Sequence, residues 1–276
     1  MKELNGRVAV ITGAASGFGR ELAILCAGEG MKLVLADIDE KGLEATRALL
    51  PAGAEVLLKR CNVAKAEEVE ALADATYQKF GAAHLLFNNA GVAVAGPTWT
   101  TTLDEWKWVL DVNLMGVVHG IRSFVPRMIE GKQPAHIVNT ASVAGLTSPP
   151  ASSVYCVSKH GVVTLSECMH HELQFMKLPI GVSVLCPAFV NTGIADAGRN
   201  RPAELSEANP MAKPFEDRVR EATRRGRLSA ADVAKITMDG VKAGTFYILT
   251  HPKIKGTIEM RMRDILDDRI PTNPMP

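Results

Sequence analysis

Three side chains in the middle of the sequence have the types and spacing needed to move a proton to or from an alcohol. Tyr155 and Lys159 are four residues apart, so on a helix they lie on one face. A phenol with a pKa of about 10 is a poor base at neutral pH, and a neighbouring ammonium lowers that pKa. Ser142 follows a short apolar run, 137–140, and could hold the substrate oxygen. A tyrosine and lysine at this spacing also occur by chance, so the surroundings have to support the interpretation.

A glycine-rich segment near the N-terminus predicts a dinucleotide site. Residues 12–19 read TGAASGFG and stand between an apolar run, 8–11, and a helix-like stretch, 19–30. Gly13, Gly17 and Gly19 permit a tight turn, close approach of backbone to a pyrophosphate and tight helix–strand packing. The free N–H groups at the start of the helix, beside Ser16 and Phe18, favour phosphate groups. Glycines are common in turns, so the prediction of a dinucleotide site depends on the strand before this segment and the helix after it.

Asp37 predicts which dinucleotide binds. It ends the second apolar run, eighteen residues after Gly19. A carboxylate there accepts hydrogen bonds from the adenosine ribose and repels a 2′-phosphate. No arginine or lysine stands at Ser16 or Ile38 to bind that phosphate, so NAD is favoured over NADP. The competing interpretation is that Asp37 only caps the following helix.

The elements that must position these residues alternate along the chain. Strand-like apolar runs lie at 8–11, 33–36, 55–59, 85–88, 137–140, 182–186 and 246–250, and helix-like stretches at 19–30, 39–50, 65–80, 102–130, 152–177 and 229–242. Continuous Val, Ile and Leu runs are typical of a parallel sheet covered on both faces. We expect one α/β domain over 1–276, a doubly wound Rossmann-type sheet of about seven strands. Residues 187–214 are expected to form an irregular substrate loop, and 253–276 a helical tail with a proline-rich end.

Together these motifs resemble the short-chain dehydrogenase/reductase family over about residues 5–195. The resemblance implies an NAD(P)-dependent enzyme that acts on CH–OH groups, with Ser142, Tyr155 and Lys159 as catalytic residues. It also implies that Asn113 is a fourth catalytic residue, which holds a proton-relay water. Asn62 stands where the family usually has aspartate, and Ala188 where it usually has glycine. The implied cofactor contacts are Gly13, Ser16, Gly17, Phe18, Gly19, Asp37, Asn62, Val63, Asn89, Ala90, Gly91, Tyr155, Lys159, Pro187, Val190 and Thr192.

The residues expected on the substrate side are apolar, namely Val94, Val143, Ala144, Phe189 and Ile194. They favour a hydrophobic secondary alcohol or ketone over a polyol. Segments 194–203 and 247–249 resemble, more weakly, a bacterial subgroup that includes dehydrogenases of benzylic alcohols derived from lignin. Two alternatives stay open, an NADP-dependent ketone reductase and a non-catalytic dinucleotide sensor or scaffold.

Composition restricts the other partners. A net charge of +1 argues against nucleic acid, and no apolar run approaches the roughly 20 residues of a membrane span. Five cysteines without a CxxC pair indicate reduced thiols in a cytoplasmic protein, and no histidine or cysteine spacing indicates a metal site. The arginines of 218–227 suggest a solvated helix face rather than an anion site. A homo-oligomer, dimer or tetramer, is expected through 102–130 and 152–177, because both stretches carry apolar residues on more than one face. These residues are Trp106, Val109, Val117, Val162, Val163 and Leu165.

Overall fold

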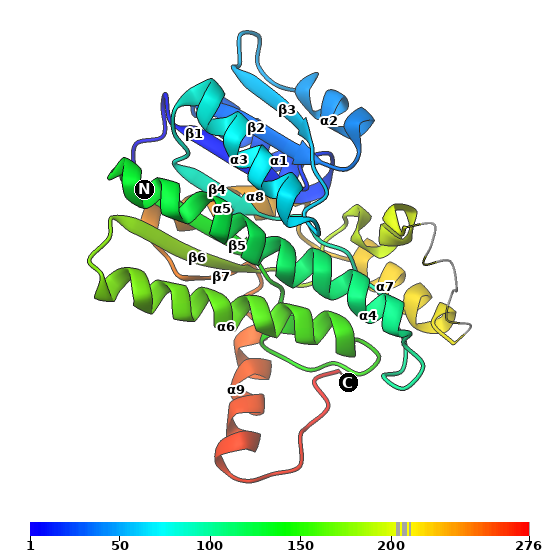
Figure 1. Cartoon of the computed structure of the whole chain (residues 1–276). Coiled ribbons are helices and arrows are strands. Elements are labelled where there is room, and N and C mark those ends of the chain that lie inside the picture. The colour runs from blue at the N-terminus through cyan, green and yellow to red at the C-terminus, as the bar shows by residue number, and fades with distance from the viewer. Residues whose placement is uncertain (203–204, 206–208, 210, 276) are drawn as a thin grey trace.

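A computed structural model describes residues 1–202, 205, 209 and 211–275. Its centre is a seven-stranded parallel sheet with the order β3-β2-β1-β4-β5-β6-β7 (Figure 1). The strands are β1 (Val8–Thr12), β2 (Lys32–Asp37), β3 (Val56–Arg60), β4 (Leu85–Asn88), β5 (Ala135–Thr140), β6 (Ile180–Cys186) and β7 (Tyr247–Leu249). The predicted fold class, a doubly wound Rossmann-type sheet, is confirmed.

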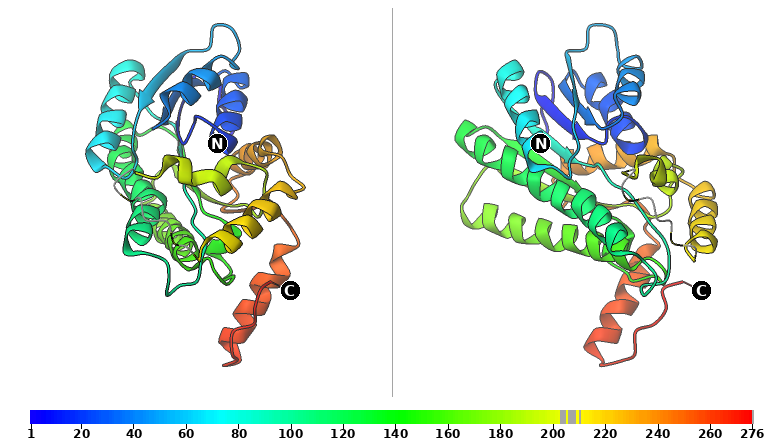
Figure 2. Two further views of the ribbon diagram at one scale, coloured as in Figure 1. Left: turned by 90° about the vertical axis from the view of Figure 1, so that its right-hand side faces the viewer. Right: turned by 45° about the vertical axis from the view of Figure 1, so that its right-hand side comes forward.

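Helices cover both faces of the sheet (Figures 1 and 2). They are α1 (Gly17–Gly28), α2 (Glu40–Arg47), α3 (Ala66–Phe80), α4 (Leu103–Leu110), α5 (Gly116–Gly131), α6 (Ser153–Phe175), α7 (Lys213–Arg224), α8 (Ala230–Ala243) and α9 (Ile254–Leu266). Successive side chains of a strand point to opposite faces. Ala9 and Ile11 of β1 therefore pack on the side of α1 with Leu22, and Val10 packs on the side of α5 with Phe124. None of the described helices is both long and apolar enough to cross a membrane.

The strand order places a crevice at one edge of the sheet. From β1 the chain winds outward to β2 and β3, then returns to pair β4 with the other side of β1. At such a reversal the loops after adjacent strands run in opposite directions, which leaves a binding crevice at their carboxyl ends. The glycine-rich turn follows β1, Asn89 follows β4 and Ser142 follows β5. The topology therefore brings together segments that are far apart in the sequence.

Two predicted segments contain detail that the sequence did not show. The helix predicted at 102–130 runs without a break through α4 and α5, with a π-helical turn at Asp111–Met115 between them. The loop expected at 187–214 contains a 3₁₀ segment, Gly193–Asn200, and ends earlier than predicted, because α7 begins at Lys213. Pro214 lies in the first turn of α7, where a proline loses no hydrogen bond and starts a helix readily.

Candidate active site

A cavity of about 1290 Å³ opens at the carboxyl edge of the sheet, from the glycine-rich turn to α7. The predicted residues in its wall are Gly13, Ser16, Gly17, Phe18, Asp37, Asn62, Val63, Asn89, Ala90, Gly91, Val94, Ser142, Val143, Ala144, Tyr155, Lys159, Pro187, Phe189, Val190, Thr192 and Ile194. Gly19 and Asn113 are buried outside this wall, so they can act only through their neighbours. A volume above the usual range for a single ligand suits a dinucleotide together with a substrate.

The glycine-rich turn packs directly against the segment after β4. Gly13 has a φ of +69°, and a Cβ at this position would lie 2.8 Å from the Cα of Ala90. The Thr12 hydroxyl oxygen accepts hydrogen bonds from the N–H groups of Asn89 (2.9 Å) and Ala90 (3.1 Å). A larger residue at position 13 would therefore clash with backbone and separate the two halves of the crevice. The turn leads into α1 at Gly17, which presents its first N–H groups to the cavity.

Asp37 holds this turn as well as facing the cavity. One carboxylate oxygen accepts a hydrogen bond from the N–H of Ala15, and the other from the N–H of Asp39, each at 3.0 Å. Burial raises the pKa of Asp37, and these two hydrogen bonds act in the opposite direction. Each carboxylate oxygen has a second lone pair, so ribose hydroxyls can still be accepted. Helix α2 is capped by Asp39, whose side chain accepts from the N–H of Gly42, and not by Asp37.

The segment after β3 forms another part of the cavity wall. The Asn62 side-chain oxygen accepts from the N–H of Ala64 at 3.1 Å, which fixes the turn that carries Val63. His119 of α5 contacts the Val63 carbonyl oxygen at 2.9 Å from its Nδ1. Asn62 therefore performs the turn-forming task that an aspartate could also perform, and it lines the cavity.

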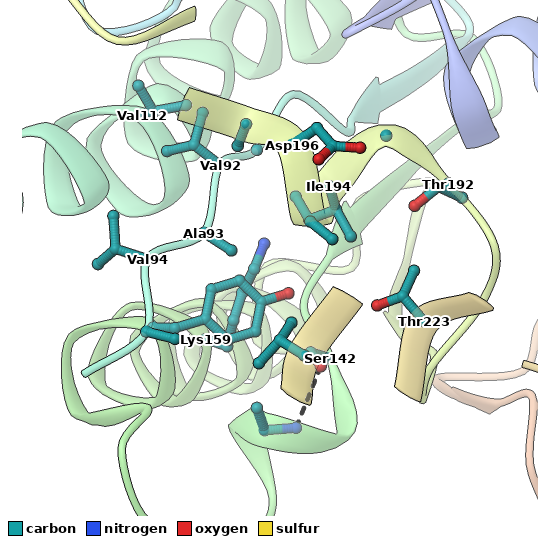
Figure 3. Close-up of a pocket in the computed structure, with 18 of the residues that line it drawn as sticks. Val92, Ala93, Val94, Val112, Ser142, Lys159, Thr192, Ile194, Asp196 and Thr223 are labelled. Atoms are coloured by element: carbon teal, nitrogen blue, oxygen red, sulfur yellow. Dashed lines mark hydrogen bonds between the residues drawn. The ribbon is translucent and has the colours of Figure 1, made fainter. Parts of the chain in front are cut away.

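Ser142 is held next to α6 by a short turn. The serine begins a 3₁₀ turn, Val143–Gly145, and its hydroxyl oxygen accepts from the N–H of Ala144 at 3.1 Å (Figure 3). A Cβ at Gly145 would lie 2.6 Å from the Lys159 carbonyl oxygen, so this turn and α6 touch backbone to backbone. The Ser142 hydroxyl also lies 3.3 Å from the carbonyl oxygen of Pro187. The loops after β5 and β6 thus fix the position of this hydroxyl in the cavity wall.

Tyr155 and Lys159 lie on the same side of α6, as predicted from their spacing. The Lys159 Nζ is 5.7 Å from the centre of the Tyr155 ring and donates a hydrogen bond of 2.8 Å to the Thr140 carbonyl oxygen. Burial raises the pKa of the Tyr155 phenol to about 12, although a hydrogen bond with Ser142 opposes this shift. Burial also lowers the pKa of Lys159 to about 8. Burial is the largest influence on the phenol pKa, so the lowering expected from the Lys159 ammonium beside a bound nicotinamide stays a prediction for the enzyme with its cofactor.

Asn113 is fully buried in the π-helical turn, where its amide binds backbone and one side chain. Its oxygen accepts from the N–H of Val92 at 2.8 Å, and its nitrogen donates to the Val92 carbonyl oxygen at 2.9 Å and to the Ser158 hydroxyl at 3.1 Å. These contacts fix the loop after β4 against α6. The amide is thus engaged by protein atoms, which favours a positioning role over the water-binding role implied by the family resemblance.

The substrate side of the cavity is mainly apolar (Figure 3). Val92, Ala93 and Val94 lie on one side, Ile194 lies opposite, and Ser142 and Lys159 lie below them. Phe189 is 46% exposed, so this ring is available at the entrance. Val190 instead packs its side chain into the core, which leaves its backbone as the part that can face a cofactor.

Several cavity residues were missed from the sequence. Trp108 of α4, the α7 residues Phe215, Val219 and Thr223, and the C-terminal residues Ile254, Thr257, Pro274 and Met275 all line the wall. No local motif marks them, because they reach the cavity only through the packing of distant segments. Arg201 pairs with Glu105 at 3.3 Å, and Glu105 is only 4% exposed. This pair, in which the carboxylate is buried, ties the loop after β6 to the start of α4.

Known proteins are similar to this chain in both sequence and fold. The sequence profile described as short chain dehydrogenase matches residues 7–202. A crystal structure of a short chain dehydrogenase/reductase from Burkholderia phymatum in complex with NAD is 49% identical, covers 100% of both chains and has a TM-score of 0.97.

Two curated relatives extend almost from end to end of the chain. The "CLA biosynthesis dehydrogenase/reductase" of Lactiplantibacillus plantarum is 36% identical over 98% of this chain and 97% of its own length. The "C alpha-dehydrogenase" of a Sphingobium species is 32% identical over 98% of this chain and 89% of its own length.

Proposed function

The chain belongs to the short-chain dehydrogenase/reductase family and is an oxidoreductase of CH–OH groups, and on this premise we propose an NAD-dependent dehydrogenase of hydrophobic secondary alcohols and their ketones. One observation carries the proposal. Ser142, Tyr155 and Lys159 share the wall of a cavity whose other end is built by the glycine-rich turn and Asp37. A proton-transfer group and a dinucleotide cradle in one enclosure are what such a reaction requires.

Tyr155 is the proposed general base for alcohol oxidation and the general acid for ketone reduction. When bound, the nicotinamide ring supplies the hydride acceptor or donor, together with the positive charge of its oxidised form. The Ser142 hydroxyl donates a hydrogen bond to the substrate oxygen and stabilises the charge that develops there. Because burial keeps the phenol protonated near neutral pH, Tyr155 is ready to donate its proton in the reductive direction.

Lys159 is proposed to act at the same site by charge and position. Its buried nitrogen already donates to the Thr140 carbonyl oxygen, so its hydrogens point in defined directions. It can donate to the cofactor's ribose and stabilise a Tyr155 phenolate. Asn113 acts as a positioning residue, since its amide fixes Val92 against Ser158 and thereby the wall that faces the catalytic side chains.

The proposed preference for NAD rests on Asp37 and on a relative. The carboxylate lies in the cavity wall, and Ile38 beside it is 36% exposed and offers no positive charge to a 2′-phosphate. The Burkholderia phymatum relative was crystallised with NAD. A negative charge at this position favours ribose hydroxyls and disfavours a phosphate dianion.

The proposed substrate class follows from the apolar wall. Val94, Val143 and Ile194 line the same cavity as Ser142 without offering partners for several hydroxyl groups. A polyol would leave its hydroxyls unpaired there, at a cost of about 1–3 kcal/mol for each buried group. A hydrophobic alcohol or ketone instead needs one polar contact, at the reacting oxygen. The Sphingobium relative is named for dehydrogenation at a Cα position, in keeping with an alcohol substrate.

The test is the change Tyr155→Phe, with Tyr77→Phe as its matched control. Tyr77 lies on α3 and outside the cavity wall. Loss of the Tyr155 hydroxyl should lower kcat with a secondary alcohol by roughly 10²–10⁴, the usual contribution of a general acid–base group. NAD affinity, measured by calorimetry, should change little. Activity of the Tyr155→Phe enzyme within about threefold of wild type would remove Tyr155 from this role.

A further inference from the structure

The C-terminal arm, residues 251–275, leaves the body of the protein and then returns to it. Helix α9 projects away from the sheet, and the chain after it runs back toward the molecule (Figures 1 and 2). The reversal has the hydrogen bonds of a helix-ending motif in which a left-handed residue follows the C-cap. Asp268 has a φ of +51°, and the N–H of Arg269 donates to the Asp264 carbonyl oxygen at 2.8 Å. The direction of the returning segment is therefore set by backbone hydrogen bonds.

A buried carboxylate fixes the returning segment against the helix. Asp264 is 5% exposed on a helix whose neighbouring residues Arg263 and Ile265 are exposed. Its Oδ2 accepts a hydrogen bond of 2.8 Å from the N–H of Thr272. A buried aspartate is uncommon unless a partner compensates for its lost hydration, and here the partner is a backbone amide eight residues further along. Asp264 thus fastens Thr272, three residues before Met275, to α9.

The position so fixed is the wall of the active-site cavity. Pro274 and Met275 line the cavity from the returning segment, and Ile254 and Thr257 line it from the start of α9. Phe215 and Val219 of α7 line the same cavity. Apart from the Thr257 hydroxyl, these side chains are apolar, although the charged residues Glu216, Arg218 and Arg220 of α7 also line the cavity. The cavity therefore extends beyond the catalytic residues into a region bounded by α7 and the arm.

We propose that the C-terminal arm is the distal wall of the substrate pocket, that Asp264 is the positioning residue that holds it there, and that the substrate carries an apolar chain beyond its carbinol carbon. This inference rests on the proposed function, because it assigns part of the same pocket. Met275 is suited to such a wall, since an unbranched thioether adapts its shape to a flexible apolar ligand. Pro274 contributes a rigid surface beside it.

The experiment compares two ketones that differ only at their distal end. Acetophenone and 4′-butylacetophenone share the reacting carbonyl group, and only the second carries a butyl chain. Each is titrated by calorimetry into the enzyme saturated with NAD, the oxidised cofactor, so that no turnover occurs. The variants are a deletion of residues 272–276, Asp264→Ala, Asp264→Asn and the control Glu259→Ala. Glu259 lies on the same helix but is exposed, and its partner is Arg263.

The expected result is selective loss of the longer ligand. The deletion and Asp264→Ala should each lower the affinity for 4′-butylacetophenone by about tenfold, which is the scale of a lost apolar contact in a pocket. They should lower the affinity for acetophenone by less than about twofold. Asp264→Asn should restore much of the affinity, because its amide oxygen can still accept from Thr272. Glu259→Ala should match wild type. Melting temperature and light scattering, measured on each variant, separate a local change from unfolding or dissociation.

Three outcomes decide the proposal. Equal affinities of wild type and the deletion variant for 4′-butylacetophenone would overturn it, and so would an equal loss of both ketones in a folded variant. If neither ketone binds the wild-type enzyme in the presence of NAD and neither is reduced with NADH, the hydrophobic substrate class itself fails, and the arm's assignment fails with it. A failure of the arm alone is distinguishable, because wild type then binds both ketones and the arm variants do the same.

Discussion

The double change Asp37→Ser with Ile38→Arg should reverse the choice of cofactor. Asp37 can accept a charge-assisted hydrogen bond from the adenosine ribose, and such a bond contributes about 1.5–3 kcal/mol. At 1.4 kcal/mol for each factor of ten, its loss lowers kcat/KM with NAD by about tenfold to a hundredfold. Position 38 is 36% exposed at the cavity wall, so an arginine there can reach a 2′-phosphate without displacing the core. The NAD/NADP ratio should therefore fall by a hundredfold or more, on the order of both effects combined.

The same substitution should also lower the stability of the fold, because Asp37 accepts hydrogen bonds from the backbone. Its carboxylate accepts from the N–H groups of Ala15 and Asp39, and a serine hydroxyl can replace only one of these bonds. An unsatisfied buried amide costs about 1–3 kcal/mol. For a chain of this size each kcal/mol lowers the melting temperature by about 2–4 °C. The variant should thus be less stable but folded at 25 °C.

The assay is the ratio of kcat/KM with NAD to kcat/KM with NADP, measured before and after substitution. Burial raises the pKa of Asp37, so the measurement is best made at about pH 8, well above the ordinary aspartate value of about 3.9. Asp39→Asn is the matched control, because it removes a charge two residues away and can still cap α2 through its side-chain oxygen. If the double variant lowers stability and leaves the cofactor ratio unchanged, Asp37 serves only the turn and our reasoning is refuted.

Two further predictions concern pH and assembly. Burial lowers the pKa of His136 from 6.5 to about 4. As the pH falls, the unfolded chain therefore binds a proton at this residue before the folded chain does. The free energy of unfolding should fall by about 3 kcal/mol between pH 6.5 and 4. Urea unfolding of wild type and His136→Asn at several pH values in this range measures the loss. The prediction is contradicted if both proteins lose the same free energy of unfolding as the pH falls. We also predict a homo-oligomer, visible by light scattering at micromolar concentration. Val157 and Phe175 of α6 are 49% and 89% exposed, and their joint change to aspartate should shift the protein toward monomer, whereas a monomeric wild type would refute the prediction.

The surface behind the assembly prediction had to be revised. Val109, Val117, Val162 and Val163, which suggested a second apolar face, are buried within the chain itself. Helices α4 and α5 are packed beside α6, so apolar residues on several faces of one helix are used inside the fold (Figure 1). The sequence shows that a residue avoids water but not which neighbour covers it.

Local sequence patterns were sufficient to predict the strands and helices and many of the residues that line the cavity. The strand predicted at 85–88 is β4, and the helix predicted to start after Asp39 is α2 with Asp39 as its cap. The spacing of Tyr155 and Lys159 placed both on one side of a helix, because helical periodicity is a property of the nearest residues. Likewise, Ser142 follows one predicted strand and Asp37 ends another, which places both at one edge of the sheet, because parallel strands share one carboxyl edge.

Only the tertiary structure decided which groups meet across the fold, and with what effect. The position of the C-terminal segment was not visible in the sequence. It brings Met275 to the cavity wall and the N–H of Thr272 to Asp264. The raised pKa of Tyr155 depends on burial among residues from several elements, which the spacing of Tyr155 and Lys159 does not show. Secondary structure follows from interactions between near neighbours in the sequence, whereas burial and cavity walls sum over the whole packed chain.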